Sequence, residues 1–138
     1  KAKQSRLILT FGYGNRKDYA ILEEYLQQFS IKYVVDIRIS PRAWSRRWYK
    51  DKIREFCLSK NVEYLSKTDL GNISGKENWI PPDRQKAEAE LSNLAEIAHN
   101  DNILLLCAEM DSRRCHRTDV ANCLENILEL DAKIIHLK

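Results

Sequence analysis

ILLLC, residues 103–107, is an unbroken apolar run. Two similar runs lie upstream, LILTF at residues 7–11 and YVVDI at residues 33–37. Strands of a parallel sheet that is covered on both faces have this character, whereas a half-exposed strand alternates apolar and polar residues. The three runs therefore predict buried strands of a parallel sheet.

Two weaker strands are predicted at residues 62–65 and 133–137, and helix-like stretches lie between the strands. In these stretches apolar residues recur every three or four positions, and Pro82 precedes a long helical stretch at residues 83–99 in the way that a first-turn proline does. Strands that alternate with helices predict right-handed crossovers. We expect an α/β fold: one three-layer domain with a mainly parallel sheet of about five strands and helices on both faces.

Composition supports one folded domain over residues 1–138. The chain is 43% hydrophobic and 31% charged, which is ordinary for a globular protein. No apolar run approaches the roughly 20 residues that span a bilayer, so we expect no membrane association. The four cysteines form no C-x-x-C pair, and Cys57 and Cys123 fall on apolar helix faces. We therefore expect reduced thiols, no structural disulfide and a cytoplasmic location. The oligomeric state is left open.

Unusual polar residues gather where the predicted strands end. They occupy residues 12–15, 36–42, 66–82 and 107–117. In open parallel sheets, ligands bind at the carboxyl ends of the strands. We therefore expect one polar site at that edge. The long 66–82 segment is expected to be a lid, a binding loop or partly disordered.

The segment 107–117, CAEMDSRRCHR, is the most informative of the four. Glu109 is predicted as a base, and His116 as an acid or base. Arginines and a helix start beside Cys115 favour a thiolate and bound anions. Cys107, at the end of a buried strand, is predicted to pack in the core. Glu109, Cys115 and His116 are therefore the candidate catalytic residues.

The first two polar segments each have two interpretations. Gly12-Tyr-Gly-Asn15 fits either a tight turn or a backbone approach to a ligand, although Lys17 replaces the third glycine of a dinucleotide motif. Asp36 lies in an apolar strand, and Arg38 projects from the same face. A structural ion pair is one interpretation of Asp36 and Arg38, and a direct ligand role is the other.

Residues 42–50, RAWSRRWYK, interleave arginines with large aromatic side chains. Seven basic residues lie between Arg38 and Arg54 against Asp51 alone, although the net charge of the whole chain is only +3. Such a segment fits phosphate attraction with base stacking. The alternative is a solvated basic face on which Trp44 or Trp48 anchors the next helix.

Two sharper interpretations of residues 107–117 are disfavoured. Cys107-x5-Arg113 has the spacing of a cysteine-phosphatase or rhodanese-type loop, but Glu109 and Asp111 within that loop would repel the anion. A metal site from Cys107, Glu109, Cys115 and His116 is chemically feasible. However, adjacent ligands at a helix start diverge by about 100°. No metal and no cofactor are therefore predicted.

Several of these motifs together resemble the family filed as domain of unknown function 488. The resemblance rests on TFGYGNR at residues 10–16, VVDIR with SPR at 34–42, LLLCAE at 104–109, CHR at 115–117 and IIHL at 134–137. It implies a small α/β domain without an established reaction, in which the family's Leu-Gly-Gly loop is Leu70-Gly71-Asn72. By matching position, the implied signature residues are Tyr13, Asn15, Asp36, Arg38, Ser40, Glu109, Cys115, His116 and Arg117.

We expect an enzyme that acts on a phosphate-bearing substrate, with nucleotide or nucleic acid as its partner. The alternative is a noncatalytic nucleic-acid- or partner-binding module that uses residues 42–50. The expected substrate-binding residues are Tyr13, Asn15, Asp36, Arg38, Ser40, Arg42 and Arg117.

Overall fold

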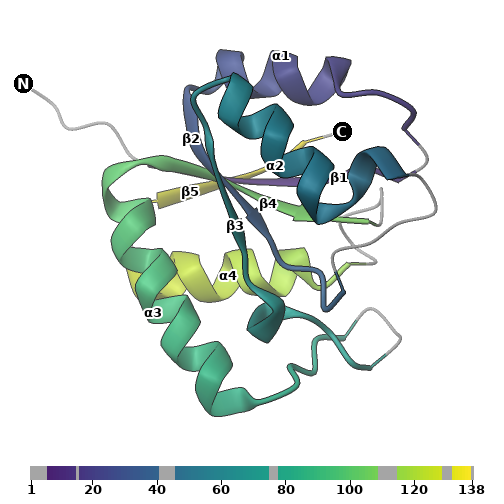
Figure 1. Ribbon diagram of the computed structural model, residues 1–138. Helices are drawn as coiled ribbons and strands as arrows, with labels where there is room; N and C mark the ends of the chain where they lie inside the picture. Colours follow the sequence, from purple (N-terminus) through teal and green to yellow (C-terminus); the bar gives the residue numbers. More distant parts are fainter. Residues whose placement is uncertain are drawn as a thin grey trace, which may run out of the picture.

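A five-stranded parallel sheet forms the centre of the computed structural model, which describes residues 6–14, 16–40, 46–74, 78–108, 115–128 and 132–137 (Figure 1). The strand order is β3-β2-β4-β1-β5, and every neighbouring pair is parallel. The strands are β1 (Arg6–Gly12), β2 (Ile31–Asp36), β3 (Glu63–Ser66), β4 (Asn102–Cys107) and β5 (Ala132–His136). The predicted α/β fold is thus confirmed.

Two helices cover each face of the sheet (Figure 1). The helices α1 (Ala20–Gln28) and α2 (Lys50–Ser59) pack on one face, and α3 (Arg84–Asn100) and α4 (Arg117–Leu128) pack on the other. Two short 3-10 helices, η1 (Arg46–Trp48) and η2 (Thr68–Leu70), precede α2 and α3. No helix among the described residues is long and apolar enough to span a bilayer.

The start of α3 lies one residue after the start of the predicted helical stretch. The helix begins at Arg84, and the prediction began at residue 83. Its N-cap is Asp83, whose side chain accepts hydrogen bonds from the backbone N–H groups of Gln85 and Lys86, 3.0 and 3.2 Å away. A capping carboxylate satisfies amides that have no partner inside the helix, so Asp83 and not the proline sets the boundary.

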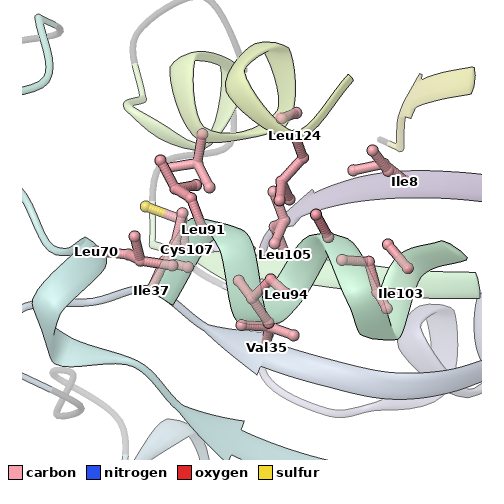
Figure 2. Packing of buried hydrophobic residues seen from close by; sticks show 14 of the residues in the cluster. Ile8, Val35, Ile37, Leu70, Leu91, Leu94, Ile103, Leu105, Cys107 and Leu124 are labelled. Atoms are coloured by element: carbon pink, nitrogen blue, oxygen red, sulfur yellow. The ribbon is translucent and has the colours of Figure 1, made fainter. Parts of the chain in front are cut away.

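Alternate residues of each strand enter two separate cores. Ile103, Leu105 and Cys107 of β4 face α3 and α4, whereas Leu104 and Leu106 face α1 and α2. Figure 2 shows the first of these cores, with the Cys107 side chain beside Ile37 and Leu70. Fully burying one such aliphatic side chain contributes about 1.5–3 kcal/mol.

The same alternation continues past the end of β2. Val35 and Ile37 belong to the α3/α4 core, and Val34 belongs to the α1/α2 core. Asp36 and Arg38 contact residues of the α1/α2 core. Polar groups at one edge of the sheet are therefore divided between its two faces.

Candidate functional site

Cys107, Cys115 and His116 form a buried group at the carboxyl edge of the sheet, which we call the Cys–Cys–His cluster. Cys107 ends β4, and the other two residues immediately precede α4. The Nδ1 atom of His116 lies 4.0 Å from the Cys107 Sγ and 3.8 Å from the Cys115 Sγ. Each of the three residues is less than a tenth exposed. The sequence predicted a site role for Cys115 and His116 but only core packing for Cys107.

A backbone contact fixes the orientation of the His116 ring. The Nε2 atom lies 3.0 Å from the carbonyl oxygen of Ile37. Because a carbonyl oxygen can only accept a hydrogen bond, this contact assigns the proton to Nε2. In the neutral ring, Nδ1 then directs its lone pair toward the two sulfur atoms.

Burial favours the neutral form of His116. It lowers the pKa of the ring below its ordinary value of 6.5, and this effect outweighs hydrogen bonding to the backbone at Ile37 and Leu70, which raises the pKa. Asp119 raises the pKa further and Arg117 lowers it. At neutral pH His116 is therefore an uncharged base or ligand.

The two cysteines of the cluster are joined as a disulfide, so the prediction of a chain without one is wrong. Absence of a C-x-x-C motif says nothing about cysteines that the fold brings together, and here the end of β4 meets the residues before α4. The two Cα atoms are 7.4 Å apart. Disulfides usually span about 4.4–6.8 Å between Cα atoms, so this separation also suits two reduced thiols that face a common centre. Cys57 and Cys123 are free.

Asp36 and Arg38 form a buried ion pair on the opposite face of the sheet. The guanidinium Nε and Nη2 atoms donate to the carboxylate over 2.8 and 2.5 Å, and Nη1 donates to the Trp48 carbonyl oxygen over 2.7 Å. The hydroxyl of Tyr64 also donates to the carboxylate. Burial alone would lower the pKa of Arg38, but the bond to Asp36 raises it above its ordinary value. These contacts favour the structural interpretation of the pair.

The predicted residues therefore do not share one environment. His116 and Cys115 lie on the α3/α4 face, whereas Arg38 and Tyr13 lie on the α1/α2 face. Arg117, the first residue of α4, is fully buried, and Ser40 is exposed. The predicted residues Asn15, Arg42 and Glu109 lie outside the described residues.

The glycine turn after β1 uses its amides within the protein. The backbone N–H of Tyr13 donates to the Cys107 carbonyl oxygen over 3.0 Å, and that of Gly14 donates to Ala108 over 2.7 Å. Gly14 has a positive φ of 55°, a conformation that glycine adopts without steric cost. These contacts favour the tight-turn interpretation over a backbone cradle for a ligand.

Trp48 anchors the helix that follows the basic segment. Its side chain is fully buried, stacks on the Tyr13 ring with centroids 4.8 Å apart, and donates from Nε1 to the Arg16 carbonyl oxygen over 2.9 Å. A base cannot stack on this ring. Trp44 lies outside the described residues.

A surface pocket of about 540 Å³ remains beside the exposed part of the basic segment. Its lining is basic and aromatic, with one acidic residue: Tyr19, Arg46, Arg47, Lys52, Glu55 and Phe56. Three of these side chains are cationic and one is acidic, so the lining has a net positive charge.

Trp79, from the predicted 66–82 loop, packs against the Cys–Cys–His cluster, which the sequence did not specify. The Trp79 ring lies 6.4 Å from the His116 ring between centroids, and its Nε1 donates to the Gly71 carbonyl oxygen over 3.0 Å. Gly71 in turn lies so close to Ile39 that an added Cβ would be 2.6 Å from the Ile39 Cα. The signal in the sequence for the packing of Trp79 on His116 was a single tryptophan in a polar loop.

Comparison with protein families matches residues 19–124 to the family described as "Domain of unknown function DUF488". The match covers well over half of the chain. The chain belongs to this family. Searches of curated proteins and of solved structures gave no match. The DUF488 match includes β2, β4 and the start of α4, so it spans the whole Cys–Cys–His cluster.

In this DUF488 domain, two sulfur atoms and one imidazole nitrogen converge in a largely apolar environment. Such groups support either thiol chemistry with a histidine base or coordination of a metal ion. The ligand atoms of all three residues lie within 4.8 Å of one another. Cys115 and His116 do not diverge as an ideal helix predicts, because α4 begins only at Arg117.

Proposed function

We propose that this chain is an enzyme that acts on a phosphate-bearing substrate, a nucleotide or nucleic acid, with its reactive groups in the Cys–Cys–His cluster. One observation carries the proposal: His116 is held through Nε2 by Ile37 while its Nδ1 faces two cysteine sulfurs at 3.8 and 4.0 Å. A histidine that only filled space in a core would not need two sulfur neighbours and a fixed ring.

The reduced cluster has the components of acid–base chemistry. The neutral His116 ring accepts a proton at Nδ1, and the Cys115 thiol is the nearest donor. Proton transfer leaves a thiolate beside an imidazolium, and each charge stabilises the other. Glu109 remains a proposed second base, because it lies between the two cysteines in the sequence.

The preference for phosphate is proposed from charge. Helix α4 starts directly after His116, and the positive end of a helix dipole favours anions. Arg113, Arg114 and Arg117 add positive charge to the same stretch of sequence. Arg38 is not included, because its contacts with Asp36 and Trp48 engage its guanidinium.

Turnover by the reduced full-length chain tests this proposal. The substrates are p-nitrophenyl phosphate, a nucleoside triphosphate and a labelled single-stranded oligonucleotide, each with and without added Zn²⁺. We expect Cys115→Ser and His116→Gln to lose turnover, and Cys123→Ser, a free cysteine of α4, to retain it. The glutamine retains an N–H donor toward Ile37 but has no Nδ1 lone pair. Absence of turnover in the wild type, or equal turnover in all variants, would refute the proposal.

The role of Glu109 has its own test. Glu109→Gln preserves size and hydrogen bonding but removes the charge that abstracts a proton. A proton-transferring Glu109 therefore predicts a stably folded variant that binds substrate without turnover. A lowered melting temperature with normal turnover would instead identify a structural carboxylate.

A second candidate function is noncatalytic binding of nucleic acid. The pocket lined by Arg46, Arg47 and Lys52 favours it, because these cations lie together on an exposed surface. This face could also hold the phosphates of the substrate proposed above. The salt dependence of oligonucleotide binding tests whether this face binds nucleic acid.

A further inference from the structure

We infer that the reduced Cys–Cys–His cluster binds one thiophilic divalent cation, with Zn²⁺ as the best fit. Cys107 and Cys115 supply thiolate sulfurs and His116 supplies Nδ1. The inference stands on the cluster alone and does not depend on the proposed activity.

The distances fit coordination of a single ion. Zinc binds thiolate sulfur at about 2.3 Å and imidazole nitrogen at about 2.0 Å, so tetrahedral geometry places these ligand atoms about 3.6 Å apart. The two sulfur-to-Nδ1 distances are 3.8 and 4.0 Å. With Cα atoms 7.4 Å apart, the two cysteine side chains can separate their sulfurs to tetrahedral spacing by small rotations.

The environment of His116 is that of a metal ligand. Histidines that bind metals through one ring nitrogen usually donate from the other to a carboxylate or a backbone carbonyl. The 3.0 Å contact between Nε2 and the Ile37 carbonyl oxygen meets this requirement. A disulfide alone has no use for an Nδ1 atom that faces both of its sulfurs.

Charge also favours the ion. Two thiolates buried close together would carry two negative charges in an apolar environment, which is costly. The two positive charges of a divalent cation would cancel the two negative charges of the thiolates that bind it. Ile37, Leu70 and Leu91 lie in the same apolar core as the two cysteines, and such surroundings strengthen the attraction between cation and thiolates.

Within the described ranges of the chain, the cluster offers three ligands. Catalytic zinc sites have three protein ligands and a fourth position that is open for water or substrate. In one known form of such sites, the protein ligands are two cysteines and one histidine. A bound ion would occupy the His116 Nδ1 atom and the Cys115 sulfur, so the metal-bound cluster and the proton transfer proposed above would be alternative states of the same residues.

The disulfide and the metal site exclude each other, because both use the same sulfur atoms. Reduction by a water-soluble phosphine converts the disulfide to two thiols, with water supplying two protons and the phosphine becoming its oxide. Zn²⁺ binding then displaces both thiol protons.

Titration of the reduced full-length chain with Co²⁺ under anaerobic conditions tests the inference. We expect one equivalent to bind, with thiolate-to-cobalt charge-transfer absorption in the near ultraviolet and tetrahedral ligand-field bands in the visible. Zn²⁺ should displace the Co²⁺ and abolish both. Cys107→Ser, Cys115→Ser and His116→Gln should lose the bands, whereas Cys123→Ser should retain them. Circular dichroism verifies that each variant is folded.

A second measurement needs no variant. Zn²⁺ should protect Cys107 and Cys115 of the reduced wild type from alkylation, as read by peptide mass spectrometry, relative to the metal-free protein. No stoichiometric Co²⁺ binding, unchanged binding in the ligand variants, or equal alkylation with and without Zn²⁺ would overturn the inference. A Cys107–Cys115 bond that survives the phosphine would also overturn it.

Discussion

The Nε2 atom of His116 donates to the carbonyl oxygen of Ile37, the residue that separates Asp36 from Arg38. This one contact joins the Cys–Cys–His cluster on one face of the sheet to the backbone at the end of β2, where the buried ion pair lies on the other face. The two groups are chemically separate but share a backbone segment. Substitutions on the two faces should therefore have different effects on stability and on ligand binding.

Acidification should destabilise the protein through His116. Its pKa is lowered in the folded state, so the unfolded chain takes up a proton that the folded chain does not. The free energy of unfolding therefore falls as pH drops below about 6.5, by at most about 1.4 kcal/mol per pH unit. Urea unfolding of the reduced, metal-free chain at several pH values measures this slope.

The slope should be smaller in His116→Gln. His136→Gln provides the comparison. Partial burial also lowers the pKa of His136, but this residue is exposed and lies at the end of β5. An identical slope in the wild type and in His116→Gln would show that His116 does not govern the pH dependence.

Removal of one partner of the buried ion pair should be costly. Asp36→Asn leaves the Arg38 charge with neutral oxygen acceptors in a buried site, and we expect a loss of about 3–5 kcal/mol in the free energy of unfolding. Chemical denaturation measures it. Lys60→Ala, which removes a partly exposed ion pair with Glu23, is the control and should cost under about 1 kcal/mol.

The double variant Asp36→Leu with Arg38→Met should recover part of this loss, because an apolar pair leaves no buried charge. Metal binding by the reduced double variant should persist if it folds, since the pair lies on the face away from the cluster. A stable Asp36→Asn would contradict the structural role of the pair.

Gly71→Ala should loosen the 66–82 loop. The new methyl group would lie 2.6 Å from the Ile39 Cα, so the backbone must shift. Forced overpacking of this kind costs about 1–3 kcal/mol. We expect a lower melting temperature and faster alkylation of Cys115 in the reduced protein, because Trp79 is held through the Gly71 carbonyl.

Ser92→Ala, at an exposed position of α3, should change neither property and is the matched control. Wild-type stability and alkylation in Gly71→Ala would show that the loop does not depend on this close contact.

Nucleic-acid binding should depend on the basic segment and on salt. Neutralised phosphates release counterions, so the affinity for a labelled oligonucleotide should fall steeply as salt rises. Replacement of Arg42, Arg46, Arg47 and Lys50 by alanine should weaken binding and flatten that salt dependence. Fluorescence anisotropy at several salt concentrations measures both. Undetectable binding at low salt, or no change in the fourfold variant, would remove this role for the segment.

Much of the fold can be predicted from the sequence because a strand that is buried on both faces consists of consecutive apolar residues. The continuous apolar run at residues 103–107 marks the central strand, since both of its faces are covered. The Asp36–Arg38 pair follows from period-two geometry, which places the two side chains on the same face.

The composition of the candidate site was less predictable for a physical reason. Knowing that residues lie at one edge of a sheet does not specify which face each enters, and Ile37 and Arg38 go to opposite faces. Cys107 was predicted to be an ordinary core residue because the residues that precede it along the chain are apolar. Its proximity to Cys115 and His116 depends on where α4 starts, and helix boundaries are weakly specified by local sequence.

The strand order also determines when the sheet can become continuous during synthesis. Strands β1 and β2 are formed first but are not neighbours, since β4 lies between them. Until residues 102–107 are synthesised, the edges of β1 and β2 that pair with β4 have no partner, and unpaired strand edges are prone to aggregation. Cys107 ends the strand that closes this gap, so the strand that makes the sheet continuous also carries one cysteine of the cluster.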